Sequence, residues 1–258
     1  MARSTFYYQL KGSAQPDKYS REKEELLSIC QEHRDRYGYR RVTVEMRKRG
    51  YLINRKTVAK LMEECGVKCR VRLHKYRSYR GEAGKIAPNL LERSFTAEKP
   101  NQKWATDVTE FSLCGKKLYL SPIMDLYNRE IVSYAISERA TFQLTMHMLE
   151  AALKGIPGKA DLILHSDQGW QYQMRQYQHR LIEKGIRQSM SRRGNCLDNA
   201  VMENFFGIVK SELLYLQKFT SVEHLRKELE EYIDYYNSKR IKVALNNMSP
   251  VQYRTHAF

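Results

Sequence analysis

Long hydrophobic runs are missing from this chain of 258 residues. A membrane-spanning helix needs roughly 18 consecutive apolar residues, and the most apolar run, "LYLSPIMDLY", is broken by Asp125. The first residues, "MARSTFYYQLKG", also lack the apolar segment of a secretion signal. We therefore expect a cytoplasmic protein without membrane contact.

Cysteine is scarce, and its five residues are an odd number, which argues against a disulfide framework. Cys65 and Cys69 with His74 suggest part of a zinc site, but no second pair of cysteines or histidines completes four ligands at finger spacing. The interpretation that we favour is reduced cysteines that serve as small core residues in a cytosolic protein.

Acidic residues are few in the first part of the chain, where 24 lysines and arginines face 12 acids over residues 1–100. The remaining residues carry 21 against 17, and the whole chain has a net charge of +16. A basic part joined to a nearly neutral part indicates a nucleic-acid-binding module fused to something else. Charge alone leaves open a soluble protein that is basic for other reasons.

The first part of the chain shows helical periodicity. Leu26, Ile29 and Cys30 share a face of a helix that we expect to begin at Ser20 as N-cap and to end at Gly38. A second helix is expected over 42–49, and a third runs from the cap Asn54 to Cys65. The pattern fits a helix-turn-helix whose last helix presents Arg55, Lys56 and Lys60 to DNA. A three-helix bundle with solvated cations fits it equally well.

A basic connection follows this helical part. The segment "KCRVRLHKYRSYRGEAGK" (residues 68–85) holds seven lysines and arginines, one glutamate and two tyrosines. Cations beside aromatic rings suit nucleic acid, although a charged linker without a partner has the same composition. The expected organisation is an arm over 1–19, a helix-turn-helix-like segment over 20–75, a basic linker over 76–98 and a catalytic domain over 99–258. That last domain divides into a compact core, 99–215, and a helical arm with a basic tail, 216–258.

The second part of the chain mixes strand and helix patterns. Strands are expected over 104–111, 118–127, 130–137, 161–167 and 186–190. Amphipathic helices are expected over 141–153, 177–184, 201–214 and 221–237. The order predicts an α/β fold, with a mixed five-stranded sheet and helices on its faces, preceded by the small basic all-helical domain.

Three acids lie where a solvated acid is not expected. Asp107 interrupts an apolar strand, Asp167 ends another, and Glu203 lies on an apolar helix between Met202 and Phe205. Three acids brought together resist ionisation unless a cation neutralises them, and hard divalent cations prefer oxygen ligands. The set therefore predicts a two-metal site for phosphodiester chemistry on nucleic acid. Taken singly, each acid is more often a cap, a turn residue or a solvated side chain.

The spacing of these acids is specific, because 59 residues separate Asp107 from Asp167 and 35 separate Asp167 from Glu203. It resembles the D,D(35)E signature of retroviral integrases and bacterial transposases. The words "WATDVTEF", "HSDQGWQY", "SRRGNCLDNAVMENFFGIVKSEL" and "YIDYYNSKRIKVALNNMSPVQYR" resemble the second-frame (OrfB) transposase of the insertion-sequence-three family. The basic front, "YGYRRVTVEMRKRGYLINRKTVAKLMEECGVK", resembles the helix-turn-helix segment that precedes its catalytic core, so the likeness covers residues 20–255.

The resemblance implies an RNase H-like core, two Mg²⁺ or Mn²⁺ ions, and DNA 3′-end cleavage followed by strand transfer. It also implies that Asp107 bridges both ions, whereas Asp167 and Glu203 each hold one. The expected partners are DNA, as element ends and target, further copies of the chain on DNA, and an upstream-frame (OrfA) fusion or partner. The chain has no sustained heptad pattern, which places end recognition and assembly by this polypeptide alone in question.

Cations around the acids are the expected DNA contacts. Lys210 follows Glu203 by seven residues, about two helical turns, so both side chains share a face. The family commonly has a basic residue there, and Arg192 and Arg193 precede the same helix as further phosphate contacts. Asn199 or Asp198 is expected to cap this helix. Lys210 as a merely solvated lysine is the alternative.

The neighbouring residues have structural readings. His165 is expected to be a buried, hydrogen-bonded histidine, and Trp170 to pack in the core rather than stack on a base. Asp125 and Glu110 are expected to be structural acids. An RNase H-like nuclease without strand transfer and a non-catalytic DNA-binding regulator are the alternative functions.

Overall fold

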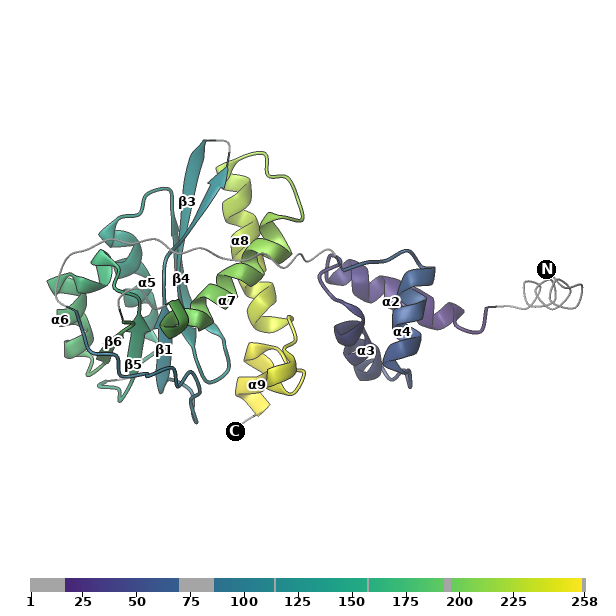
Figure 1. The fold of residues 1–258 in the computed structure, drawn as a ribbon, viewed down its shortest axis with the longest axis horizontal. Helices are drawn as coiled ribbons and strands as arrows, with labels where there is room; N and C mark the ends of the chain where they lie inside the picture. Colours follow the sequence, from purple (N-terminus) through teal and green to yellow (C-terminus); the bar gives the residue numbers. More distant parts are fainter. Residues whose placement is uncertain (1–16, 70–85, 114, 157, 193–195, 257–258) are drawn as a thin grey trace, which may run out of the picture. The chain divides into compact units, whose positions relative to one another are not determined.

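The computed structural model describes residues 17–69, 86–113, 115–156, 158–192 and 196–256 (Figure 1). The chain divides into two compact units, Met1–Val71 and Arg72–Phe258, each with buried apolar residues of its own. Within the described ranges, every helix is too short or too polar to cross a membrane.

The first unit holds three helices, α2 (Ser20–Glu32), α3 (Tyr39–Lys48) and α4 (Arg55–Glu64). Fully buried Leu26, Ile29, Val42, Met46 and Val58 form its core, because they recur at three- and four-residue steps on the inner faces.

Of the three helix boundaries that the sequence predicts in this unit, the structure confirms one and corrects two. Asn54 caps α4, as expected, since its side chain accepts a hydrogen bond from the Lys56 amide at 2.9 Å. The expected N-cap Ser20 is wrong by one residue, because Ser20 lies inside α2 and Tyr19 is at the cap. Gly38 is also wrong as the end of α2. That helix ends earlier, because Arg34 and Asp35 adopt positive φ and turn the chain, and Gly38 instead precedes α3.

The second unit is built on a mixed sheet (Figure 1). Its strands are β1 (Lys103–Thr106), β2 (Thr109–Leu113), β3 (Lys116–Asp125), β4 (Ile131–Ser137), β5 (Ile163–Ser166) and β6 (Arg187–Met190). β3 pairs antiparallel with β1, β2 and β4, whereas β5 pairs in parallel with both β1 and β6.

The expected single strand over 104–111 is interrupted at Asp107. Thr106 pairs with Ile123 and Thr109 pairs with Leu120, so three steps along one strand match three steps along β3. β1 and β2 therefore occupy one position beside β3, and the six strands fill the five positions that the sequence predicts. Asp107 lies in the gap, outside the ladder.

Helices cover both faces of this sheet. They are α5 (Phe142–Lys154), α6 (Arg175–Glu183), α7 (Ala200–Val209), α8 (Val222–Ser238) and α9 (Pro250–His256), with a π-helical turn, Lys210–Leu214, that extends α7. Short 3₁₀ turns lie at Trp170–Gln173, Cys196–Asn199 and Val243–Leu245.

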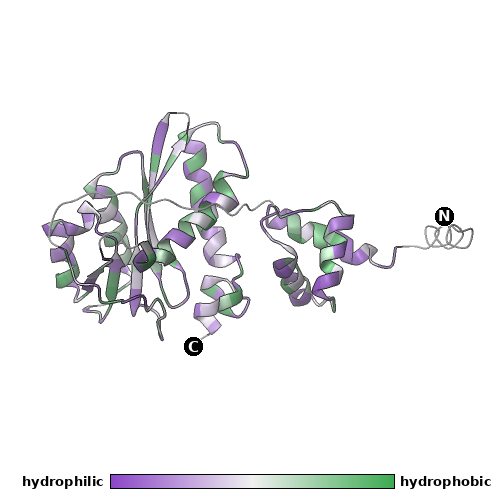
Figure 2. Ribbon diagram, in the orientation of Figure 1, coloured by the Kyte–Doolittle hydropathy of each residue, from purple (hydrophilic) through white to green (hydrophobic). Residues whose placement is uncertain are grey.

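Two apolar cores result. α7 and α8 pack against Ala105 and Phe111, whereas α5 and α6 pack against Trp104 and Ile123. Trp104 and Ala105 are neighbours that point to opposite faces, as strand geometry requires. The covering helices carry both hydrophobic and hydrophilic residues, as expected for one buried and one solvated face (Figure 2).

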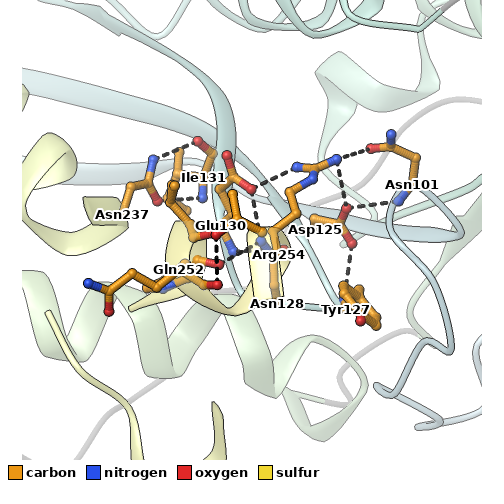
Figure 3. A network of polar contacts seen from close by, with 12 residues as sticks. Asn101, Asp125, Tyr127, Asn128, Glu130, Ile131, Asn237, Gln252 and Arg254 are labelled. Carbon is orange, nitrogen blue, oxygen red and sulfur yellow. Dashed lines mark hydrogen bonds and ion pairs between the residues drawn. The ribbon is translucent and has the colours of Figure 1, made fainter. Parts of the chain in front are cut away.

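The last helix is tied to the sheet by a polar network (Figure 3). Arg254 of α9 bonds Glu130 at 2.7 Å and lies 3.9 Å from the fully buried Asp125. The side-chain amide of Asn128 donates to Glu130 and to the carbonyl of Pro250. Arg240, also near the end of the chain, is buried against Glu212 with two bonds of 2.7 Å. These two cations of the C-terminal segment therefore serve the fold.

Residues 86–97 pack along the sheet of the second unit. Pro88 accepts a backbone hydrogen bond from Met190 at the end of β6, and the Leu90 amide donates to Ser189. Leu91 is buried in the same core as α7 and α8. This segment therefore covers the outer edge of β6.

Candidate active site

Asp107 and Asp167 lie side by side because of the parallel pairing of β1 and β5. Ala105 pairs with His165. Asp107 follows Ala105 by two residues, and Asp167 follows His165 by two residues. Both carboxyl groups therefore lie at the carboxyl ends of adjacent parallel strands, the usual place for functional groups in such sheets.

Backbone amides orient both carboxyl groups. One oxygen of Asp107 accepts from the Val108 amide at 2.7 Å, and one oxygen of Asp167 accepts from the Gly169 amide at 2.8 Å. Gly169 has a φ of −58°, which any residue can adopt. A Cβ there would lie 2.7 Å from Nε2 of Gln171 and 2.9 Å from Oδ1 of Asp167, so the absence of a side chain leaves room for both of these side chains.

Glu203 comes from the first turn of α7, which packs against β1. Its neighbours Met202 and Phe205 are buried in the core, while Glu203 itself is half-buried. Burial raises the pKa of the Glu203 carboxyl group.

Burial disfavours the charged form of each of the three acids, and the two other acids add to this effect at Asp107. Burial, and then the charges of Asp167 and Glu203, raise the pKa of Asp107 well above its usual range, against the opposing effects of the Val108 amide and Lys210. Burial raises the pKa of Asp167, opposed by the Gly169 amide. Three ionised carboxylates therefore require a cation to neutralise them.

The donor set fits a hard divalent cation, since all three side chains offer carboxylate oxygens. In the described part of the chain, no three of the His, Cys, Asp and Glu side chains stand close enough to enclose one ion. The two strand-end aspartates supply the fixed part of the set, and Glu203 belongs to a separate helix.

Lys210 begins the π-helical turn after α7 and is half-buried. Its ammonium group lies 5.8 Å from the centre of the Phe111 ring. Burial lowers the pKa of Lys210, and the charges of Glu110 and Asp107 oppose that effect. The positive charge of Lys210 therefore acts on Asp107, and it would also attract an anionic ligand at this site.

Asp198 does not cap α7, contrary to the expectation from the sequence. Its buried carboxylate accepts from Arg192 at 2.9 Å, from Arg93 at 3.0 Å and from the Asn89 amide at 3.1 Å. Hydrogen bonds from Arg192, chief among several causes, hold the pKa of Asp198 far below its usual range. Arg192, an expected DNA contact, keeps an exposed side chain while it makes this ion pair.

Asn199 does not cap α7 either. It occupies the cap position, but its side chain makes no capping hydrogen bond. Its Nδ2 donates instead to the second oxygen of Asp107 at 3.1 Å. Both cap expectations are wrong for the same reason: long-range partners take up side chains that local preference assigns to the helix end.

His165 is confirmed as a structural histidine. It is fully buried, and Nε2 donates to the Asp198 carbonyl at 2.8 Å while Nδ1 accepts from Ser189 at 2.8 Å. Burial lowers the pKa of His165, so the ring is neutral, and both nitrogens are engaged. The ring joins β5 and β6 to the segment that leads into α7.

The remaining expectations near the site have mixed outcomes. Trp170 is 48% exposed, so core packing is wrong for it. Asp125 is confirmed as structural, because its carboxylate accepts from the Asn101 and Tyr127 amides. Glu110 is also structural, bonded to Lys117 and Tyr119. Arg193 lies outside the described residues.

In the helical unit, the expected DNA-contact residues Arg55, Lys56 and Lys60 are exposed on α4, opposite the buried Val58 and Leu61. Lys60 forms an ion pair with Glu64 one turn along, at 3.6 Å. Cys30 is buried in this unit, whereas Cys69 is exposed.

Sequence reasoning missed three features of the acid site: Gly169, the Asn199 contact and Tyr172. Tyr172 is fully buried. Burial, and then the charges of Asp107 and Asp167, raise the pKa of Tyr172 well above its usual range. The available signal was position, since Gly169 and Tyr172 closely follow Asp167 in "HSDQGWQY".

Three family models match the chain. Two describe an integrase core domain, over residues 97–196 and 203–258, and one describes an HTH-like domain over residues 18–75.

Curated relatives match nearly the whole chain. The InsK protein of insertion sequence element IS150 from Escherichia coli (strain K12) is 51% identical over 99% of this chain and 90% of its own length. Transposase InsF for insertion sequence IS3A, from the same organism, is 36% identical over 88% of this chain and 80% of its own.

One solved structure shows the same fold at low sequence identity. The simian T-cell lymphotropic virus intasome in complex with PP2A regulatory subunit B56 gamma contains a chain that is 18% identical, with a TM-score of 0.52. The alignment covers 84% of this chain and 70% of that one. The HTLV-2 integrase catalytic core domain in complex with magnesium matches 61% of this chain and 98% of its own, at 17% identity and a TM-score of 0.49.

Proposed function

The chain belongs to the insertion-sequence-three family of transposases, with an integrase core after an HTH-like domain, and on this premise we propose that Asp107, Asp167 and Glu203 form its catalytic centre. The reaction is DNA 3′-end cleavage followed by strand transfer. The observation that carries the proposal is the placement of Asp107 and Asp167 on adjacent strand ends, where burial and mutual repulsion raise the pKa of Asp107.

Asp107, Asp167 and Glu203 would together hold two divalent ions, Mg²⁺ or Mn²⁺, through their carboxylate oxygens. Such ions stabilise the attacking and leaving oxygens of an in-line displacement at phosphorus. The Val108 amide binds one oxygen of Asp107 and the Asn199 side chain donates to the other, while the Gly169 amide binds one oxygen of Asp167. Each carboxylate oxygen accepts more than one contact, so lone pairs of both aspartates remain for the ions.

The chemistry has two displacements that balance. Water attacks phosphorus at the element end, the bond to the 3′ oxygen breaks, and a 3′-hydroxyl is released. That hydroxyl then attacks a target phosphodiester, and the target's own 3′ oxygen leaves. In both steps Lys210 supplies a positive charge that attracts the reacting phosphate, whereas the carboxylates would act on that phosphate through the ions that they hold.

DNA is the substrate, and the cations around the site are the proposed contacts. Lys210, Arg192 and Arg193 would grip the backbone near the reacting phosphate, whereas Arg55, Lys56 and Lys60 of the HTH-like domain would bind the element end. We further propose that several copies assemble on DNA, that an upstream-frame (OrfA) product takes part, and that the reaction occurs in the cytoplasm.

The test compares Asp107→Asn and Glu203→Gln with the unchanged protein. A labelled element end with Mg²⁺ or Mn²⁺ reports cleavage, and a target plasmid with a labelled 3′-hydroxyl end reports strand transfer. Both variants are expected to lose both reactions at least a hundredfold, since an ion ligand is removed, while DNA affinity stays within about threefold.

Glu110→Gln is the matched control, because Glu110 is a nearby acid whose partners are Lys117 and Tyr119. It is expected to retain both reactions. Cleavage by Asp107→Asn at the unchanged rate would contradict the proposal. Cleavage without any strand transfer by the unchanged protein would point instead to an RNase H-like nuclease.

A further inference from the structure

Asn199 stands immediately before α7, where a short polar side chain ordinarily caps the helix. The residue is only 5% exposed, yet its side chain makes no capping bond. The amide instead spans to another element and donates from Nδ2 to Oδ2 of Asp107 at 3.1 Å. A residue of the Glu203 helix therefore contacts the Asp107 carboxylate directly.

The orientation of this amide is set by its partner. As an ion ligand the Asp107 carboxylate is ionised and only accepts hydrogen bonds, which agrees with the observed orientation: the nitrogen of the amide faces Asp107 and the oxygen faces away from it. That oxygen, Oδ1, is buried and has no hydrogen-bond partner among the described residues. A buried acceptor without a donor is unfavourable, which indicates a donor that arrives with the ligand.

The backbone on either side of Asn199 is fixed. Asp198, just before it, is held through its carboxylate by Arg192 and Arg93 and through its carbonyl by His165. Glu203 follows Asn199 by four residues on α7. The amide therefore connects Asp107 to the start of the helix that carries Glu203.

From this geometry we propose that Asn199 is a positioning residue for the ion-binding acids. Its Nδ2 holds the Asp107 carboxylate toward α7, and its Oδ1 accepts a hydrogen bond from a water molecule bound to the divalent ion. The inference rests on the proposed function, because it takes Asp107 as an ion ligand.

The test measures Mn²⁺ binding to the full chain without DNA, by isothermal titration calorimetry. Asn199→Ala removes both the donor and the acceptor and is expected to raise the Mn²⁺ dissociation constant about tenfold, as loss of a group that orients a metal ligand typically does. Asn199→Ser, which keeps a small polar residue at the helix start, is expected to raise it severalfold. Circular dichroism identifies which of the two Asn199 variants fold, and the Mn²⁺ affinity of one folded variant is enough to test the inference.

Asn128→Ala is the matched control. Asn128 is another fully buried asparagine of the same unit, and its amide bonds Glu130 and the Pro250 carbonyl. Loss of these bonds is expected to lower the unfolding temperature while Mn²⁺ affinity stays unchanged. An equal loss of Mn²⁺ affinity in Asn128→Ala, or unchanged affinity in a folded Asn199 variant, would overturn the inference.

DNA cleavage gives a second readout. In Asn199→Ala, the Mn²⁺ concentration for half-maximal cleavage is expected to rise about tenfold, with a smaller change in the maximal rate. A lower maximal rate at an unchanged half-maximal concentration would count against the role. If the unchanged protein binds no Mn²⁺, the proposed function fails; if it binds and the Asn199 variants bind equally well, only this inference fails.

Discussion

The pKa values of two aspartates in the second unit, Asp107 and Asp198, are shifted in opposite directions because their partners differ. Asp107 faces two other acids and is half-buried, so the pKa of its carboxyl group is raised. Asp198 faces two arginines, so the pKa of its carboxyl group is lowered. At neutral pH the ionised form of Asp107 therefore destabilises the fold, whereas the ionised form of Asp198 stabilises it.

Asp107→Asn is expected to stabilise the metal-free protein at pH 7 to 8. Between the ordinary aspartate pKa, about 4, and the raised pKa, folded Asp107 keeps a proton that the unfolded chain has lost, so its contribution to stability falls as pH rises. Removing that penalty should add on the order of 1 kcal/mol, a rise of roughly 2–4 °C in the unfolding temperature. Thermal unfolding in a chelator from pH 5 to pH 8 measures it.

Asp234→Asn, at an exposed acid on α8, is the control for this prediction and should leave the unfolding temperature unchanged. Added Mn²⁺ should stabilise the unchanged protein more than Asp107→Asn, since an ion favours the charged acids. An unfolding temperature of Asp107→Asn at or below that of the unchanged protein at pH 8 would refute the electrostatic account.

The positions of the acids could be predicted from the sequence, but their polar partners could not. Asp107, Asp167 and Glu203 interrupt apolar segments, which is visible in the sequence. Because Asn and Asp are preferred at helix N-caps, the sequence predicted that the side chain of Asn199 or Asp198 bonds the first amides of α7. Their actual partners, such as Asp107 and Arg93, lie far away in the chain, where no local preference can indicate them.

At the scale of elements, the strand pattern predicted the sheet but concealed its break. Both sides of Asp107 keep the same register against β3, so the alternation of apolar residues continues through the gap. Helix ends were less predictable for the same kind of reason. The π-helical turn at Lys210 and the positive φ of Arg34 are conformations that no residue preference of lysine or arginine predicts.

The segment before α7 is locked by Asp198, and Asp198→Asn is expected to loosen it. Two arginines would lose a buried anionic partner, which should lower the free energy of unfolding by about 2 kcal/mol at pH 7. The stabilisation is present above the ordinary aspartate pKa and is lost only as pH falls through the lowered one. Urea unfolding at pH 7 and at pH 2 should therefore show a difference between the two proteins that shrinks in acid.

Asp161→Asn provides the comparison for this lock, because Asp161 also pairs with an arginine, Arg187, but on the surface with its side chain 89% exposed. An exposed pair contributes little, so that variant should unfold like the unchanged protein. Equal effects of Asp198→Asn and Asp161→Asn at pH 7 would mean that the Asp198 contacts do not secure the start of α7.

At the scale of the whole molecule, the uneven charge of the sequence corresponds to two units with different contents. The first unit is small, helical and basic. The second unit holds the sheet, the two apolar cores on its faces, and the acids Asp107, Asp167 and Glu203. Net charge did not show which cations remain available. Arg240 and Arg254 are held in ion pairs by the second unit, while Arg55, Lys56 and Lys60 are exposed in the first.

The last prediction follows from this division of labour. Binding of an element end by the full chain should weaken with salt, because each cation that neutralises a phosphate releases counterions. Replacing Arg55, Lys56 and Lys60 together with alanine should reduce the slope of log affinity against log salt by roughly 2 to 3, about 0.9 for each phosphate that is no longer neutralised. Titrations of labelled DNA from low to moderate salt give that slope.

Lys227 offers an unusually close control. It is 77% exposed and pairs with Glu231 one helical turn away, just as Lys60 is 77% exposed and pairs with Glu64. Equal exposure and equal local pairing mean that only the position on the molecule differs, so Lys227→Ala should keep the slope while Lys60→Ala lowers it by about 0.9. If both single variants show the same slope, α4 is not part of the DNA-binding surface, because Lys60 then contributes no more to DNA binding than Lys227 does.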